Sequence, residues 1–262
     1  MSAELLENLP NWCWFIVFPA VSLLVLILLT AIFRIFSKHI GLQDFDTEIL
    51  DTATQNVMSG AYVVLGFVLV LVMATVNDID NNVSKEASQI ESLDRLLIMD
   101  GSLAAKTARH TLLQYTKSIV TDEWGQLSSG AKNPKTRKYA EELFNQIKLI
   151  EPATNRQAAL FIEIVNAGDD IAQSRNLRIM NSKSRLPVLF WQLSYLTLFG
   201  VIVIAALRLI NPSHIRIIAL SVQLTMISWL LAAVMILDLP YLGQVKASPE
   251  AFQRAINLIS VR

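Results

Sequence analysis

Four stretches of the chain are dominated by apolar residues and contain no Asp, Glu, Lys or Arg. They cover residues 8–33, 52–77, 186–207 and 217–237. A helix needs about 20 predominantly apolar residues to cross a bilayer, and a crossing backbone must satisfy its own hydrogen bonds. The pattern predicts four transmembrane helices in a two-plus-two arrangement. The first pair has its apolar cores at about 12–33 and 55–77, and a short turn makes the second pair an antiparallel hairpin.

The first apolar stretch could also be a cleaved signal peptide. A signal peptide begins with a positively charged segment, followed by a shorter apolar core. Here the residues before the stretch include Glu4 and Glu7 and neither Lys nor Arg. We therefore expect a retained transmembrane helix.

The segment between the second and third apolar stretches has a different pattern. Residues 78–185 contain 15 Lys and Arg and 14 Asp and Glu. Apolar residues recur every three or four positions, beginning with Val83, Ala87 and Ile90, which predicts amphipathic helices. We expect the second membrane helix to continue into water until Gly101, and Ser102 to cap the next helix. The fold class predicted is an all-α membrane protein with a helical soluble domain between the second and third transmembrane helices.

The C-terminal residues predict one more short amphipathic helix. Ser248 is expected as its N-cap and Pro249 as its first residue. Its apolar face contains Phe252, Ala255, Ile256 and Ile259. That face should pack on the soluble segment. The expected organisation is a first transmembrane pair within 1–77, a soluble domain at 78–185, a second pair within 186–237 and a C-terminal segment at 238–262.

Composition narrows the class of function. The chain has 22 basic and 22 acidic residues, so its formal charge is zero and nucleic acid is not an expected partner. Cys13 is the single cysteine, and the three histidines are far apart, so no metal site is predicted. The sequence contains no phosphate-binding loop, nucleophile elbow or zinc motif. An enzyme is the least favoured class, and no cofactor is expected.

A stripe along the second apolar stretch is the candidate functional site. Its members follow one another by four and then three residues, which places them on one helix face: Ser59, Val63, Gly66, Val70, Met73, Asn77 and Asp80. Its side chains are small at one end, apolar in the middle and polar where the helix leaves the membrane. It could line a pore closed by an apolar constriction. It could also be a helix–helix contact, because small residues mark such contacts in membranes.

Charged residues near the apolar stretches predict an orientation. Four crossings place both termini and the middle segment on one side of the membrane. That side carries eight nearby Lys and Arg residues, and the two short loops carry four. The positive-inside rule then favours cytoplasmic termini and a cytoplasmic middle domain.

Several short motifs resemble those of the bacterial bestrophin-like membrane family. They are Glu91-Ser92-Leu93-Asp94-Arg95-Leu96, Tyr115 followed by Glu123-Trp124, Arg185-Leu186-Pro187, and a post-membrane element containing Asp238, Pro240, Gly243, Ser248 and Pro249. The resemblance implies a layout similar to bestrophins, which are homopentameric anion channels with cytoplasmic helices. It also implies self-association within a lipid bilayer, the inner membrane of a bacterium.

Two hypotheses follow for the function. The first is a homo-oligomeric ion channel or pore, with an anion as the permeant ion. The alternative is a non-conducting membrane scaffold or signalling protein whose helical soluble domain binds a partner.

Overall fold

The computed structural model describes residues 10–40, 47–129, 132–183, 185–210, 213–238 and 248–262. These residues form helices and connecting turns and contain no strand. The chain divides into two compact units, one of residues 1–75 and 185–245 and the other of residues 76–184 and 246–262. The all-α prediction is therefore confirmed for the described part of the chain.

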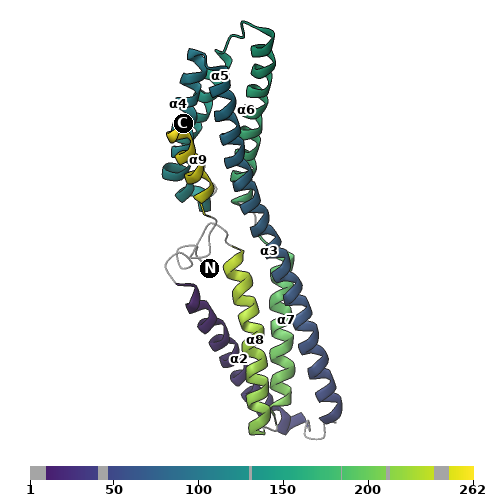
Figure 1. Ribbon diagram of the computed structural model, residues 1–262. Helices are drawn as coiled ribbons and strands as arrows, with labels where there is room; N and C mark the ends of the chain where they lie inside the picture. Colours follow the sequence, from purple (N-terminus) through teal and green to yellow (C-terminus); the bar gives the residue numbers. More distant parts are fainter. Residues whose placement is uncertain (1–9, 41–46, 130–131, 184, 211–212, 239–247) are drawn as a thin grey trace. The chain divides into compact units, whose positions relative to one another are not determined.

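The first unit contains the four helices that are long and apolar enough to cross a membrane. They are α2 (Asn11–Ile40), the first part of α3 (Thr47–Asp100), α7 (Val188–Arg208) and α8 (His214–Leu237) (Figure 1). Their shared core includes Leu26, Leu65, Val201 and Leu224, each at most 3% exposed. The apolar stretch ends at Phe33, but α2 continues through Arg34 and Lys38 to Ile40.

Polar contacts between these membrane helices are few and specific. The Ser228 hydroxyl donates to the Ser22 hydroxyl at 2.9 Å and so joins α8 to α2. The Trp229 indole donates to the Phe15 carbonyl at 2.8 Å. Arg34 donates to the Leu209 carbonyl at 2.9 Å and satisfies an acceptor at the end of α7. In an apolar medium each bond satisfies a polar group that would otherwise be costly to bury.

The second unit is a bundle of amphipathic helices. It contains the rest of α3, α4 (Leu103–Ser118), α5 (Pro134–Lys148), α6 (Asn155–Asn181) and α9 (Glu250–Val261). Two short turns follow α4, a π-helical turn η2 (Ile119–Glu123) and a 3-10 helix η3 (Trp124–Ser129). The core has residues from every long helix, including Ile90, Leu112, Leu143, Ile164 and Phe252.

The break between α3 and α4 forms where the sequence predicts it. Gly101 has a φ of +70°, a left-handed conformation that glycine adopts readily and that ends a helix. The Ser102 hydroxyl then accepts a hydrogen bond from the Ala105 amide at 3.1 Å, which caps α4. The chain can therefore turn sharply at this point without leaving the first amides of α4 unsatisfied.

The terminal helix α9 packs on the bundle through the predicted face. Phe252, Ala255 and Ile259 are at most 4% exposed within the core of the second unit. The helix begins one residue later than predicted, at Glu250, so Pro249 is its N-cap rather than its first residue. Pro249 has a ψ of 10°, which falls outside the helical range. The Ser248 hydroxyl still accepts from the Glu250 amide, at 3.3 Å.

Candidate functional site

The candidate stripe on α3 is exposed in the single chain. Within the membrane-spanning part, Val63 is 72%, Val70 is 63% and Met73 is 50% exposed. Ser59 on the same face is exposed as well, and around Gly66 a Cβ would find no heavy atom within 4 Å. Among the described residues, this stripe has no packing partner within the chain that would explain its small residues.

The opposite face of α3 is the one that packs against the chain's own helices. Leu65 and Val68 are fully buried, and Val72 is 3% exposed. Val68 and Val72 lie in one apolar cluster with Val234 of α8. Because the opposite face of α3 packs against α8, the stripe can contact lipid, a pore or another subunit.

The polar end of the stripe lies in the part of α3 that belongs to the second unit. Asn77 and Asp80 are both exposed there. Within the described residues, no group of His, Cys, Asp and Glu side chains is arranged to hold a metal ion. Asp80 is therefore an exposed acidic side chain that belongs to no such group.

Asp238, the first residue of the post-membrane motif, holds two membrane helices together. Its carboxylate accepts from the Leu186 amide at 2.5 Å and from the Trp191 indole at 3.2 Å. Asp238 is the C-cap of α8, and both donors lie at the start of α7, so the bonds join the two helix ends. Pro240 and Gly243 of the same motif lie outside the described residues.

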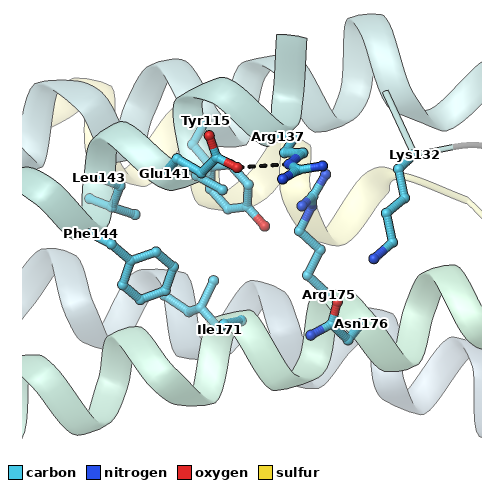
Figure 2. Close-up of a pocket in the computed structure, with 11 residues that line it drawn as sticks. Tyr115, Lys132, Arg137, Glu141, Leu143, Phe144, Ile171, Arg175 and Asn176 are labelled. Carbon is cyan, nitrogen blue, oxygen red and sulfur yellow. Dashed lines mark hydrogen bonds and ion pairs between the residues drawn. The ribbon is translucent and has the colours of Figure 1, made fainter. Parts of the chain in front are cut away.

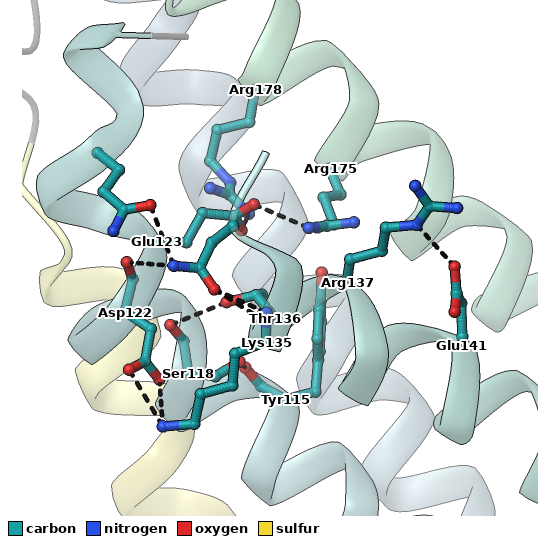
Figure 3. Close-up of polar contacts among 12 residues, drawn as sticks. Tyr115, Ser118, Asp122, Glu123, Lys135, Thr136, Arg137, Glu141, Arg175 and Arg178 are labelled. Carbon is teal, nitrogen blue, oxygen red and sulfur yellow. Dashed lines mark hydrogen bonds and ion pairs between the residues drawn. The ribbon is translucent and has the colours of Figure 1, made fainter. Parts of the chain in front are cut away.

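A second polar centre, which the sequence analysis did not predict, lies inside the second unit. Arg178 of α6 is fully buried and donates to both carboxylate oxygens of Glu86 on α3, at 2.7 and 3.2 Å. It also donates to Glu123 at 3.2 Å, and Arg175 donates to the other Glu123 oxygen at 2.8 Å (Figure 3). The Tyr115 hydroxyl donates to Glu86 at 3.3 Å. We call these five residues the buried charge cluster.

The electrostatics of this cluster follow from its burial and its ion pairs. Burial raises the pKa of the Tyr115 phenol well above the usual value of 10.0, and the negative charge of Glu86 raises it further. Burial alone would lower the pKa of Arg178, but Glu86 and Glu123 outweigh it and raise the pKa. The cluster therefore has two carboxylates, two guanidinium groups and a neutral phenol.

Aromatic residues enclose the cluster and connect it to the terminal helix. The guanidinium carbon of Arg178 lies 5.5 Å from the ring centroid of Phe252 and 6.0 Å from that of Trp124. The two rings contact each other edge to face, with centroids 5.8 Å apart. The face of an aromatic ring attracts a cation, and the effect strengthens when water is excluded. Phe252 thus contributes to both the apolar core and the surroundings of Arg178.

The sequence contains a signal for this cluster. On α6, Arg175 and Arg178 continue the buried face that includes Ile164 and Ile171, and on α3 Glu86 lies between the buried Val83 and Ile90. A charged residue at an apolar position of a helix face indicates either a solvated edge or a buried ion pair. Only the packing of α3, α6 and η2 against one another distinguishes the two cases.

Comparisons with known proteins agree with this architecture. A family model described as a Bestrophin-like domain matches residues 19–252. The fold is similar to the crystal structure of a bacterial bestrophin homologue from Klebsiella pneumoniae that carries a mutation. That match has a TM-score of 0.68 and 12% sequence identity, and it covers 95% of this chain and 99% of the other. A search of curated proteins finds no match.

Proposed function

Because the chain belongs to the bestrophin-like family, we propose that this integral membrane protein assembles as a homo-oligomer around an ion-conducting pore lined by α3. The observation that carries the proposal is the exposed stripe on α3, which combines small, apolar and polar residues on a helix whose other face is packed. By resemblance to bestrophins, we propose five subunits and an anion as the permeant ion.

The composition of the stripe favours a pore over contact with lipid. The exposed side chains of α2 include Leu24, Ile27 and Ile35, which are large and apolar, as lipid contact requires. The α3 stripe has Ser59 and Gly66 instead, although this face is also exposed and has room for large apolar side chains. Small side chains allow neighbouring helices to approach closely, and polar side chains can contact water in a pore. Contact with lipid requires neither.

The pore proposal includes a closed state set by apolar side chains. Val63, Val70 and Met73 form successive apolar levels along the stripe, separated by one helical turn or two. A narrow ring of such side chains excludes water and blocks ions without a moving plug. We infer that hydration of these levels controls conduction.

Ion flux into vesicles reconstituted with the purified protein tests the proposal. Met73→Gln replaces an apolar level by a polar one of similar size, so it should raise flux, and Val70→Thr should raise it less. Val68→Thr is the matched control, because it makes the same change on the packed face of α3. It should lower thermal stability and leave flux at the wild-type level.

The outcome separates the pore from the scaffold hypothesis. Flux must be compared at equal amounts of inserted oligomer, since a destabilised variant inserts less protein. If wild type and both stripe variants pass no ion, with anions and cations each tested, the pore proposal is wrong and a non-conducting scaffold is favoured. If Val68→Thr raises flux as much as Val70→Thr, α3 lines no pore with this face.

A further inference from the structure

A cavity lies beside the buried charge cluster, within the second unit. Its volume is about 310 Å³, and residues of α4, α5 and α6 line it (Figure 2). This volume is at the lower end of the range for small-molecule sites. Tyr115 and Arg175 belong to both the cavity wall and the cluster, so the wall includes side chains that the ion pairs already hold in place.

The wall of the cavity changes in character from one end to the other. Figure 2 shows Arg137, Arg175 and Lys132 toward one end and Phe144 and Ile171 toward the other. Helix geometry agrees with the picture, because Phe144 follows Arg137 by seven residues, or about 10 Å at 1.5 Å per residue. The cavity is thus cationic at one end and apolar at the other.

The charges at the cationic end are only partly neutralised. Arg137 pairs with Glu141 at 2.7 Å, in a contact in which both side chains are at least 60% exposed. Lys132 has no partner among the described residues that face the cavity. Three basic side chains therefore face one acidic side chain across the cavity wall, and Glu123 lies behind Arg175.

Arg175 is the basic residue of this wall whose side chain is mostly buried and held by an ion pair. Its side chain is only 10% exposed, and its Nη2 donates to Glu123 at 2.8 Å. Its Nε is buried and has no hydrogen-bond partner within the protein. A buried donor without a partner costs free energy, and a charged donor costs more than a neutral one. Because Nε is closed to solvent, an anion in the cavity would meet the exposed tenth of the Arg175 side chain and not Nε.

We propose that this cavity binds a small organic anion, with its carboxylate or phosphate group at Arg137, Lys132 and Arg175 and its apolar body against Phe144 and Ile171. A carboxylate or phosphate accepts from guanidinium groups at two points, which favours it over a monatomic ion. An inorganic ion would leave the apolar end filled only by water. This inference goes beyond the proposed pore, and its test is a binding measurement that does not depend on ion flux.

Three aromatic probes test the proposal on the full-length protein in mild detergent. Benzoate and phenyl phosphate each combine an anionic group with an apolar ring, and benzamide is the uncharged analogue of benzoate. Calorimetric titration and ligand-observed magnetic resonance measure their binding. We expect both anions to bind and benzamide to bind at least tenfold more weakly, since charged hydrogen bonds are worth roughly that factor.

Charge variants then locate the site. The double variant Lys132→Gln with Arg137→Gln removes two exposed charges and should weaken benzoate binding by roughly tenfold or more. Lys148→Gln with Arg156→Gln is the matched control, because it removes one exposed charge from each of α5 and α6 away from the cavity. It should leave binding unchanged. Glu141→Gln removes the opposing carboxylate and should tighten binding.

A steric variant is independent of charge. Ala172 lines the cavity on α6, and Ala172→Leu fills part of the space. It should abolish binding of both anions while the thermal unfolding temperature stays close to that of the wild type. The proposal is overturned if the wild type binds neither anion at millimolar concentration. It is equally overturned if benzamide binds as well as benzoate, or if the cavity and control double variants bind alike.

Discussion

Arg178 is the residue that joins the two carboxylates of the buried charge cluster. It is fully buried, and it is the one side chain that bonds both Glu86 and Glu123 within the described cluster. Removing one partner of a buried ion pair leaves uncompensated charge in a medium that solvates it poorly, at a cost of about 3–5 kcal/mol. Here the loss of one guanidinium removes an ion-pair partner from both carboxylates.

We predict that Arg178→Met lowers the free energy of unfolding of the second unit by about 3–5 kcal/mol. Methionine keeps much of the length and apolar volume of the side chain, so the loss reports on charge rather than on a cavity. Thermal or denaturant unfolding of the full-length protein in detergent measures it. Arg156→Met, at an exposed position of the same helix, should change stability little. Equal effects of the two variants would contradict a central role for the cluster.

Tyr115 gives the cluster a dependence on alkaline pH. Burial raises the pKa of its phenol above 10.0, so the folded state keeps the proton at a pH where the unfolded state releases it. The contribution of this raised pKa to stability is complete below the unfolded pKa and declines as pH rises through and beyond it.

Tyr115→Phe should therefore lower stability by about 1 kcal/mol at neutral pH, where it removes the bond to Glu86. The difference from the wild type should shrink above pH 10.0, because phenylalanine has no proton to release. Unfolding curves at neutral and strongly alkaline pH provide the measurement. Tyr139→Phe, on the half-buried surface of α5, serves as the control. A deficit that stays constant with pH would show that Tyr115 does not titrate on unfolding.

Sequence reasoning at the residue scale identified capping residues and missed the buried charges. Ser102 and Gly101 were predictable because a cap and a left-handed glycine act within one turn of chain. Glu86 and Arg178 are 92 residues apart, and only the packing of α3 against α6 brings them together. Nothing local in the sequence distinguishes this pair from two solvated charges.

At the scale of elements, α9 holds the end of the chain to the bundle. Phe252 is fully buried and contacts Trp124, and Arg109 donates to the Ile259 carbonyl at 2.8 Å while it pairs with Asp94. The helix is therefore fixed at both its ends, by an aromatic contact at the start and a hydrogen bond near its last turn.

Phe252→Asp should release α9 and loosen the second unit. Truncating a buried phenylalanine costs about 3–5 kcal/mol, and burying a carboxylate adds to that cost. Trypsin should then cleave faster at Lys132 and Lys135, while membrane insertion stays normal. Leu258→Asp makes the same type of change at a residue of α9 that is 42% exposed, so its cleavage should stay close to that of the wild type. Unchanged cleavage of Phe252→Asp would indicate that α9 is not needed to hold the bundle.

The elements themselves were largely predictable from apolar periodicity. Each of the four charge-free stretches overlaps a helix that is long and apolar enough to cross a membrane, and the amphipathic pattern after Val83 correctly predicts that α3 continues. The helix ends were less predictable, because charge marks where lipid contact ends and not where helical hydrogen bonding ends. The π-helical turn Ile119–Glu123, which directs Glu123 into the cluster, has no signal in the local pattern.

At the scale of the whole molecule, the first question is which side of the membrane holds the second unit. An even number of crossings places residue Arg262 and the segment near Ser129 on the same side. The excess of basic residues predicts that this side is cytoplasmic. Green fluorescent protein should fluoresce when it is joined after Arg262 or inserted near Ser129, and alkaline phosphatase should be inactive at both positions. Active phosphatase at both positions would reverse the orientation.

The second question at this scale is what the α3 stripe faces in the assembled protein. Lipid, a neighbouring subunit and a water-filled pore would each leave Val70 exposed in the single chain. The chemistry of a cysteine placed at this position distinguishes the three surroundings. A thiol reacts as the thiolate, which forms in water and not in hydrocarbon, and neighbouring subunits can be linked only where their cysteines meet.

We predict that Val70→Cys, in a Cys13→Ser background that has no other cysteine, forms covalent dimers with a short bismaleimide and reacts with a charged thiol reagent added from water. Val68→Cys on the packed face, where Val68 is fully buried, should do neither. Denaturing electrophoresis and mass measurement give the two results. Cross-linking without reaction toward the charged reagent would mean that the stripe is a dry contact between subunits, as a scaffold requires. Absence of both would place the stripe against lipid, and only the two together support a wet axis surrounded by α3 helices.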